Sequence, residues 1–250
     1  MTTFWTLYRR ELGSYFLSPI AYIVLFISAL MLGLYLSFEL SANMEFKHNS
    51  RAIIQMTSMN VVAIFLLFFQ PALITMRTFS EEYKLGTIES LLTAPVREWE
   101  VVAAKFAGAW TFFMILWLPM LTNVVVVWAF SGNHMPPVWP LVGSTFLVYA
   151  LLGAVFCSLG VLTSAMTRNQ ILAALTCFFL TFMLLFIGLV SVLYYDPLLR
   201  DIMGAFSPLL QIYNFSNGIV DTRPIVFYLS TTVLALFLAL RLLQARRHRA

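Results

Sequence analysis

Charged residues are scarce in this sequence. Only 10% of the 250 residues are Asp, Glu, Lys or Arg, whereas 61% are hydrophobic. A soluble domain carries about 25% charged residues because its surface faces water. The scarcity excludes a mainly aqueous surface and indicates an integral membrane protein. The net charge of +4 does not indicate nucleic acid binding, because the charges lie in short clusters between long apolar runs.

Cysteine is rare as well. The sequence has two cysteines, Cys157 and Cys177, and both lie within apolar runs. Two buried thiols are too few for a disulfide framework or a metal site. We interpret them as small packing residues and expect no metal.

The sequence contains several long apolar runs. A helix needs about 20 mostly apolar residues to cross the hydrocarbon core of a bilayer. We therefore predict an all-α, polytopic membrane protein with six transmembrane helices in a single domain over 1–250. The predicted spans are residues 18–38, 56–76, 106–130, 138–166, 171–193 and 224–240.

The distribution of Lys and Arg predicts the orientation. With six spans, 11 of the 15 basic residues fall on the side that holds both ends of the chain. Basic residues are retained on the cytoplasmic side of a membrane. We therefore expect a multi-pass protein with both termini in the cytoplasm.

Ionisable residues are missing from all six predicted spans, which contain no Asp, Glu, Lys, Arg or His. Ion-coupled carriers and intramembrane enzymes keep such groups at depth because their chemistry requires them. The chain also lacks the G-x-x-x-x-G-K-[ST] loop that binds nucleotide phosphates. We expect no catalytic residue in this chain, so energy for transport would have to come from a partner that hydrolyses ATP.

The segment between the second and third predicted spans is acidic and amphipathic. Thr78 and Glu81 have the spacing of a capping box, which predicts a helix that begins near Ser80 and continues through 80–94. An apolar stripe recurs at helical spacing on this segment, at Leu85, Ile88 and Leu92. Periodicity alone favours an ordinary helix at the membrane surface.

Several motifs resemble those of ABC-2-type transporter permeases, and in particular the gliding-motility (GldF-like) branch of that family. The strongest motif is Glu-Glu-x-x-x-Gly-Thr-x-Glu-x-Leu-Leu-x-x-Pro-Val over 81–96. Others are Arg-Glu-Leu-x-x-Tyr-Phe-x-Ser-Pro-Ile over 10–20, Thr-Met-Arg-Thr-Phe over 75–79, and Thr-Arg-Asn-Gln over 167–170. Phe-Ser-x-Gly-Ile-Val-Asp over 215–221 completes a similarity that covers nearly the whole chain.

The resemblance implies that 80–94 is a coupling helix seated in a groove of a separate ABC ATPase subunit. It implies that ATP and Mg are bound by that ATPase, and that this chain binds no cofactor. Gly86 would allow close approach of the backbone to the ATPase. Alternatively, Gly86 would break the helix and Thr87 would cap a second short helix. The residues assigned to ATPase coupling are Glu81, Glu82, Gly86, Thr87, Glu89 and Leu92.

The family pattern also implies an N-terminal elbow helix over 1–17, where Tyr8, Leu12 and Tyr15 recur at helical spacing. Arg9 and Arg10 would face lipid phosphates, or act only as topology signals. The segment 197–218 resembles a partly re-entrant element on the outer side, although an interfacial loop is an equal alternative.

The function implied is a permease that exports cargo across a bacterial cytoplasmic (inner) membrane together with a second permease copy or a homologous permease. An accessory membrane protein with an extracytoplasmic domain is a further implied partner. A mechanical subunit that drives extracytoplasmic machinery without passing cargo is the alternative. The sequence does not identify a substrate.

Overall fold

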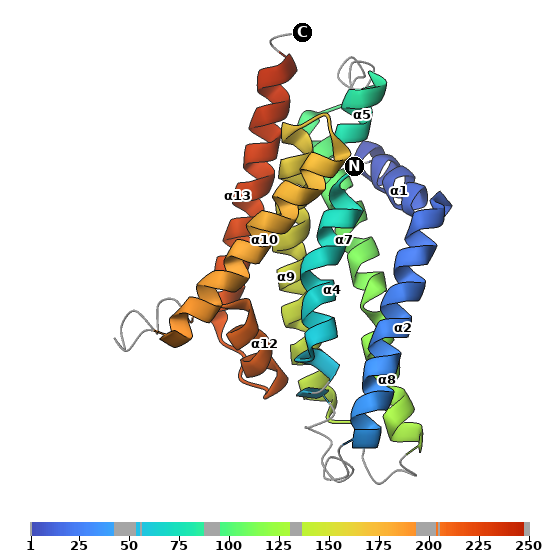
Figure 1. Ribbon diagram of the computed structural model, residues 1–250. Coiled ribbons are helices and arrows are strands. Elements are labelled where there is room, and N and C mark those ends of the chain that lie inside the picture. The colour runs from blue at the N-terminus through green and yellow to red at the C-terminus, as the bar shows by residue number, and fades with distance from the viewer. Residues whose placement is uncertain are drawn as a thin grey trace.

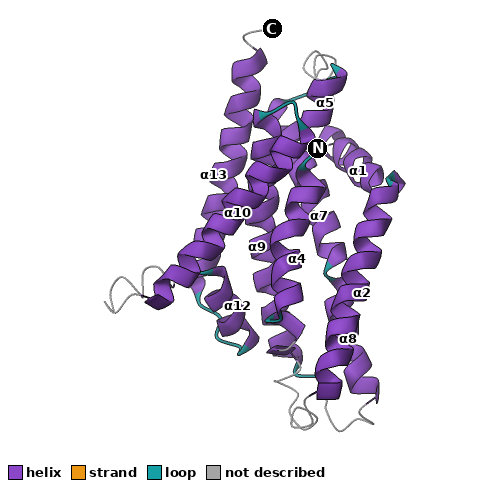
Figure 2. Cartoon of the chain, in the orientation of Figure 1, coloured by secondary structure: helices purple, strands orange, loops and turns teal. Residues whose placement is uncertain are grey.

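The computed structural model describes residues 2–42, 54–55, 57–87, 96–130, 137–193, 204 and 206–247. Within these ranges the chain is helical and contains no strand (Figure 2), so the predicted all-α class is confirmed. The helices are α1 (Thr2–Leu17), α2 (Pro19–Ala42), α4 (Val61–Thr75), α5 (Ser80–Leu85), α7 (Glu98–Leu116), α8 (Leu118–Phe130), α9 (Trp139–Met166), α10 (Gln170–Leu193), α12 (Pro208–Ser216) and α13 (Thr222–Arg247).

The long helices run side by side as a bundle (Figure 1). Among the described residues, five segments are long and apolar enough to cross a membrane: Pro19–Ser41, Val61–Leu85, Glu98–Ala129, Trp139–Met166 and Thr222–Arg246. A shorter apolar stretch, Gln170–Phe186, lies in α10. The polytopic architecture is confirmed, and the number of six spans remains a prediction.

Both chain ends and α5 lie at one end of the bundle, which we call the termini-bearing end (Figure 1). Helix α1 crosses this end and packs against α7. Helix α12 lies near the opposite end, beside α9 and α10. The arrangement places the start and the end of the chain on the same side, as an even number of spans requires.

The third span differs from its predicted form. It was expected over 106–130, but the helix begins at Glu98, where the Glu100 side chain accepts the Arg97 backbone N–H at 3.3 Å. Such acidic first-turn residues stabilise a helix N-terminus. The helix is also divided at Trp117 into α7 and α8, because Pro119 has no N–H to continue the hydrogen-bond ladder. As a result, Lys105 lies inside a long apolar helix instead of preceding it.

Helix α9 is the centre of the bundle. In its apolar window 72% of the residues are buried, against 22% for the windows of α2 and α13. Gly153 lets α9 approach α7, because a Cβ at this position would overlap the Phe113 ring. Gly160 does the same toward α4, where a Cβ would overlap Thr75. Small residues at such contacts let membrane helices pack closely.

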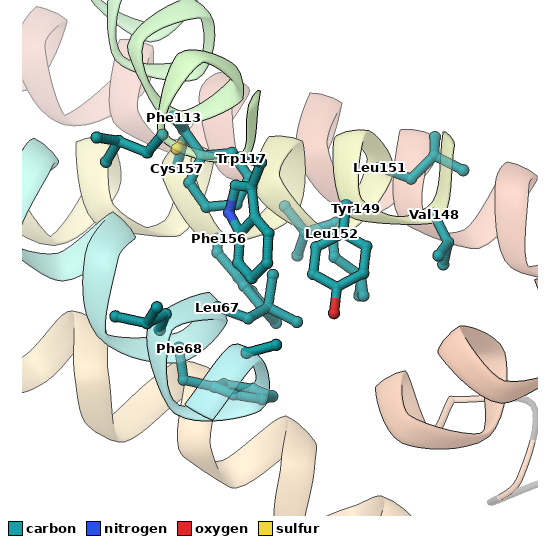
Figure 3. Packing of buried hydrophobic residues seen from close by; sticks show 14 of the residues in the cluster. Leu67, Phe68, Phe113, Trp117, Val148, Tyr149, Leu151, Leu152, Phe156 and Cys157 are labelled. Atoms are coloured by element: carbon teal, nitrogen blue, oxygen red, sulfur yellow. The ribbon is translucent and has the colours of Figure 1, made fainter. Parts of the chain in front are cut away.

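Aromatic rings fill the space around α9 (Figure 3). Trp117 and Tyr149 are fully buried, with ring centroids 4.3 Å apart. The Tyr149 hydroxyl donates to the Ser58 carbonyl oxygen at 2.5 Å, so its polar end is satisfied. This core contains no charged side chain among the described residues.

The segment 197–218, predicted to lie on the outer side, is only partly described, because 197–203 and 205 lie outside the described ranges. Its helix α12 begins after Ser207, whose hydroxyl accepts the Leu210 N–H. Phe215 is buried in the main core, and the Ser144 hydroxyl of α9 donates to its carbonyl oxygen at 2.7 Å. The segment is therefore docked on the bundle; its re-entrant character remains a prediction.

Candidate functional site: a charged joint at the termini-bearing end

The acidic segment forms a shorter helix than expected. Helix α5 begins at Ser80, as predicted, but ends at Leu85 because Gly86 adopts the left-handed conformation with φ of 71°. A left-handed glycine is a common helix stop. The expectation of an unbroken helix through 80–94 is therefore wrong at Gly86, which acts as the break. Glu89 and Leu92 lie outside the described residues, as does all of 88–95.

The predicted capping box is also wrong. The N-cap position of α5 is Phe79, and no side chain caps it from there. Thr78 donates its hydroxyl to the Thr75 carbonyl oxygen at 2.8 Å instead. Thr78 thus prolongs the end of α4 and does not start α5.

The first turn of α5 is capped from another helix. The Ser164 hydroxyl oxygen of α9 accepts the backbone N–H groups of Phe79 at 3.0 Å and Ser80 at 3.1 Å. Helix N-termini leave such donors unpaired, and both residues are fully buried. Ser164 therefore fixes the start of α5 against α9.

Three ionisable side chains, Glu11, Glu82 and Lys105, form what we call the charged joint. The Lys105 Nζ lies 2.7 Å from Glu82 Oε1 and 3.2 Å from Glu11 Oε1. The Lys105 side chain is 3% exposed, and those of Glu11 and Glu82 are 14% and 20% exposed. A buried ammonium is tolerated only when it is paired. The joint therefore ties α1, α5 and α7 together through one cation.

Glu82 does not point freely outward. One of its carboxylate oxygens is occupied by Lys105. Glu82 is therefore paired within this chain, and its contact with an ATPase remains a prediction. Glu81, in contrast, is half-buried, and Thr87 is exposed, with its hydroxyl donating to the Glu82 carbonyl oxygen at 3.5 Å.

Helix α13 reaches the same segment from the other side. The Arg246 guanidinium lies over the Tyr83 ring, 4.4 Å from its centroid, and donates to the Met166 carbonyl oxygen at 2.7 Å. An apolar cluster continues this contact below the surface, with Phe79, Val161 and Leu243 among its buried members. The segment 76–83 is thus held by α1, α7, α9 and α13 at once.

Helix α1 occupies the range expected for the elbow helix. Its Tyr8 hydroxyl donates to Thr111 Oγ1 at 3.1 Å, and the Tyr15 ring stacks on Phe112 at 5.1 Å. Arg9 and Arg10 are both exposed, and Arg10 reaches Glu11 at 3.3 Å. Contact of these arginines with lipid phosphates remains a prediction.

The sequence does not reveal all the residues that hold α5. Glu11 belongs to the motif over 10–20 and Lys105 directly precedes the predicted span 106–130, but nothing in their spacing pairs them. No pattern predicts the contacts of Ser164 and Arg246 with 79–83. The one usable signal was a lysine beside an apolar run, since a cation there requires a nearby carboxylate. No group of His, Cys, Asp or Glu that could hold a metal is found in the part of the chain that the structure describes.

The fold and the joint define a polytopic helical membrane protein in which most of the charged side chains that the structure describes lie toward the termini-bearing end. The chain matches the family model described as ABC-2 family transporter protein over residues 5–247. It therefore belongs to the ABC-2 family of transporter permeases, as its motifs indicated. A search of curated proteins returned no match.

Proposed function

We propose that this chain is the transmembrane permease subunit of an ABC transporter, which couples ATP hydrolysis by a separate ATPase to export across a bacterial inner membrane. Permeases of this family normally work with an ABC ATPase. ATP and Mg would be bound by that partner. Both termini, and with them the termini-bearing end, would face the cytoplasm.

The charged joint is the observation that carries this proposal. A force applied to α5 is resisted by Lys105 on α7, Ser164 on α9 and Arg246 on α13. A rigid segment held by several spans can pass a displacement to all of them, because packed helices shift as units. This is the mechanical property that a coupling element requires.

The exposed residues at the end of α5 indicate the surface that would contact the ATPase. Leu85 is 67% exposed, and Gly86 and Thr87 are exposed beside it. An exposed leucine next to acidic Glu81 suits a partner groove with an apolar floor and a basic rim. Glu89 and Leu92 continue the motif and are assigned to the same contact.

A second permease copy or a homologous permease completes the transporter in this proposal. The low burial of α2 and α13 supports it, because their exposed apolar faces must meet either lipid or another subunit. An accessory membrane protein with an extracytoplasmic domain and membership of the GldF-like branch are the finer parts of the proposal.

A mechanical subunit that transmits ATP energy outward without passing cargo is the alternative. It would use the same joint, because both functions start from a displacement of α5. Hydrolysis by the reconstituted complex distinguishes them: stimulation by a candidate cargo supports export, whereas ATP turnover that responds only to the accessory protein supports the mechanical role.

Charge reversal at Glu81 tests the coupling. We expect Glu81→Lys to lower permease-stimulated ATPase activity about thirtyfold or more, since a lost interfacial charge pair costs about 2–5 kcal/mol and about 1.4 kcal/mol is a factor of ten. The variant should remain folded, because Glu81 is outside the charged joint.

Asp221→Lys, at the exposed start of α13 on the opposite end, is the matched control and should keep full activity. Full activity of Glu81→Lys would remove this residue from the contact. Reversal at Glu82 is a poorer test because it would also break the joint.

A further inference from the structure

A cavity opens beside the charged joint and has no role in the function proposed above. Its volume is about 820 Å³, and its walls come from α1, α2, the end of α4, α5 and α7. Pockets for small molecules usually measure roughly 300–1,000 Å³. The cavity is therefore large enough for a ligand and not merely for a few water molecules.

The lining of the cavity is of two kinds. It includes the charged residues Arg77, Glu82 and Lys105 and the apolar residues Ile20, Ala21 and Val24. The apolar residues belong to the first turns of α2. The cavity is therefore bordered both by the charges and by the beginning of a helix that is apolar enough to cross a membrane.

Two buried polar atoms of opposite kind lack partners at this cavity. Arg77 Nε, a donor, and Glu82 Oε2, an acceptor, are buried without a hydrogen-bond partner in the described chain, and both residues line the cavity. An unmade hydrogen bond to a buried charged group is costly. A ligand in the cavity that presents both an acceptor and a donor would satisfy both groups once the Arg77 and Glu82 side chains turn toward it.

The charges around the cavity identify the ligand class. Three basic residues and three acidic residues line it: Arg10, Arg77, Lys105, Glu11, Glu81 and Glu82. A purely anionic head group would leave Glu82 Oε2 unpaired and would meet three carboxylates. A head group with a phosphate and a primary ammonium matches both signs, because phosphate accepts from guanidinium and ammonium carries three N–H donors.

We propose that this cavity binds one aminophospholipid of the phosphatidylethanolamine type, with its phosphate at Arg77, its ammonium at Glu82 and its acyl chains along α2. The lipid fills the space beside α1 and α5, so it supports the charged joint. The apolar half of the cavity distinguishes a lipid from a free zwitterion, which would leave Val24 and its neighbours uncovered.

Native mass spectrometry of the purified, delipidated chain in detergent tests this site. The probes are phosphatidylethanolamine, phosphatidylcholine, phosphatidylglycerol and soluble glycerophosphoethanolamine. We expect a one-to-one adduct with phosphatidylethanolamine, retained about tenfold better than the other two lipids, because the choline head group has no N–H donor and the glycerol head group has no ammonium. Equal retention of the three lipids, or retention of the soluble head group alone, overturns the proposal.

Two variants locate the site. Arg77→Gln should reduce the adduct about tenfold, whereas Arg168→Gln should not change it, since Arg168 is exposed and does not line the cavity. Val24→Phe should also abolish the adduct by filling the apolar half without touching a charge. An adduct that survives both Arg77→Gln and Val24→Phe overturns the proposal, and the wild-type comparison of lipids decides it if either variant fails to fold.

Discussion

The neutral core around α9 and the charged joint at the termini-bearing end hold the same helices together by different physical means. In the core, Trp117, Tyr149 and Phe113 are fully buried and interlock by shape. In the joint, Lys105 holds two carboxylates from two other helices. Packed shape has one low-energy arrangement, whereas an ion cluster can exchange partners when a subunit or ligand brings new charges.

This difference separates the part of the protein that must keep its form from the part that can respond. The described residues of the core cluster carry no charge that a partner could compete for. The joint lies at the end of the bundle where the proposed ATPase would bind, and its two carboxylates are partly exposed. We therefore expect substitutions in the core to affect stability alone, and substitutions in the joint to affect stability and coupling separately.

The largest effect is expected at the centre of the joint. Lys105→Met removes the cation and leaves Glu11 and Glu82 facing each other, so we expect a loss of about 3 kcal/mol in the free energy of unfolding. The measurement is reversible unfolding in mixed micelles, followed by circular dichroism. The triple variant Glu11→Gln, Lys105→Met, Glu82→Gln should recover most of this stability, because no unpaired charge remains.

The triple variant also tests whether the joint, unlike the core, does more than stabilise the fold. If the joint transmits motion, ATPase stimulation should remain low in this variant although the fold is restored. Restored stimulation would show that the ions serve stability alone.

A smaller effect is expected where α7 meets α9. Gly153→Ala places a Cβ in the ring of fully buried Phe113, so it should lower the free energy of unfolding by about 1–3 kcal/mol. Gly143→Ala, on the same helix with nothing within 4 Å, should instead be neutral or stabilise by up to about 1 kcal/mol. Thermal unfolding of the two variants in the same detergent tests the pair, and equal shifts would contradict close packing at Gly153.

A smaller loss of stability is expected when the Ser164 hydroxyl, which connects α9 to the start of α5, is removed. Ser164→Ala leaves the N–H groups of Phe79 and Ser80 without their acceptor, at a cost of about 1–2 kcal/mol. Ser158→Ala is the matched control, because its hydroxyl only donates to Val155 in its own helix. Hydrogen exchange at 79–85 should increase in the first variant and not in the second. Unchanged exchange in the first variant would show that Ser164 does not cap α5.

The smallest effect is expected at the end of α13. Arg246→Gln loses the cation–π contact with Tyr83, which is worth about 0.5–1 kcal/mol at an exposed site. Arg241→Gln, which loses a similar contact to Phe237 in its own helix, should cost no more. ATPase stimulation separates the two, since only Arg246 contacts α5. Equal stimulation in both variants would exclude α13 from the coupling path.

Much of the fold was predictable because the bilayer imposes simple rules on sequence. Apolar runs of sufficient length gave the helices, and breakers such as Gly86 gave a recognisable alternative to a continuous helix. The position of Lys105 was less clear, because hydropathy places a lysine at the edge of a span and does not show that the helix extends past it to Glu98.

The candidate site was predictable only in part. The motif over 81–96 located the acidic segment, since its residues are contiguous. The partners that hold it were not predictable, because Glu11, Lys105, Ser164 and Arg246 are far apart in the sequence and no periodicity relates them. The lipid cavity has no signature in the sequence at all, because its walls come from five separate elements.

The sequence by itself determined that this protein lies in a membrane, is built from helices and belongs among ABC-2 permeases, because composition and local motifs carry that information. Only the tertiary structure decided that Glu82 faces Lys105 and that Arg77 faces a cavity. The physical reason is that a charge near a membrane must find a counter-charge, and the packing of distant helices determines which one it finds.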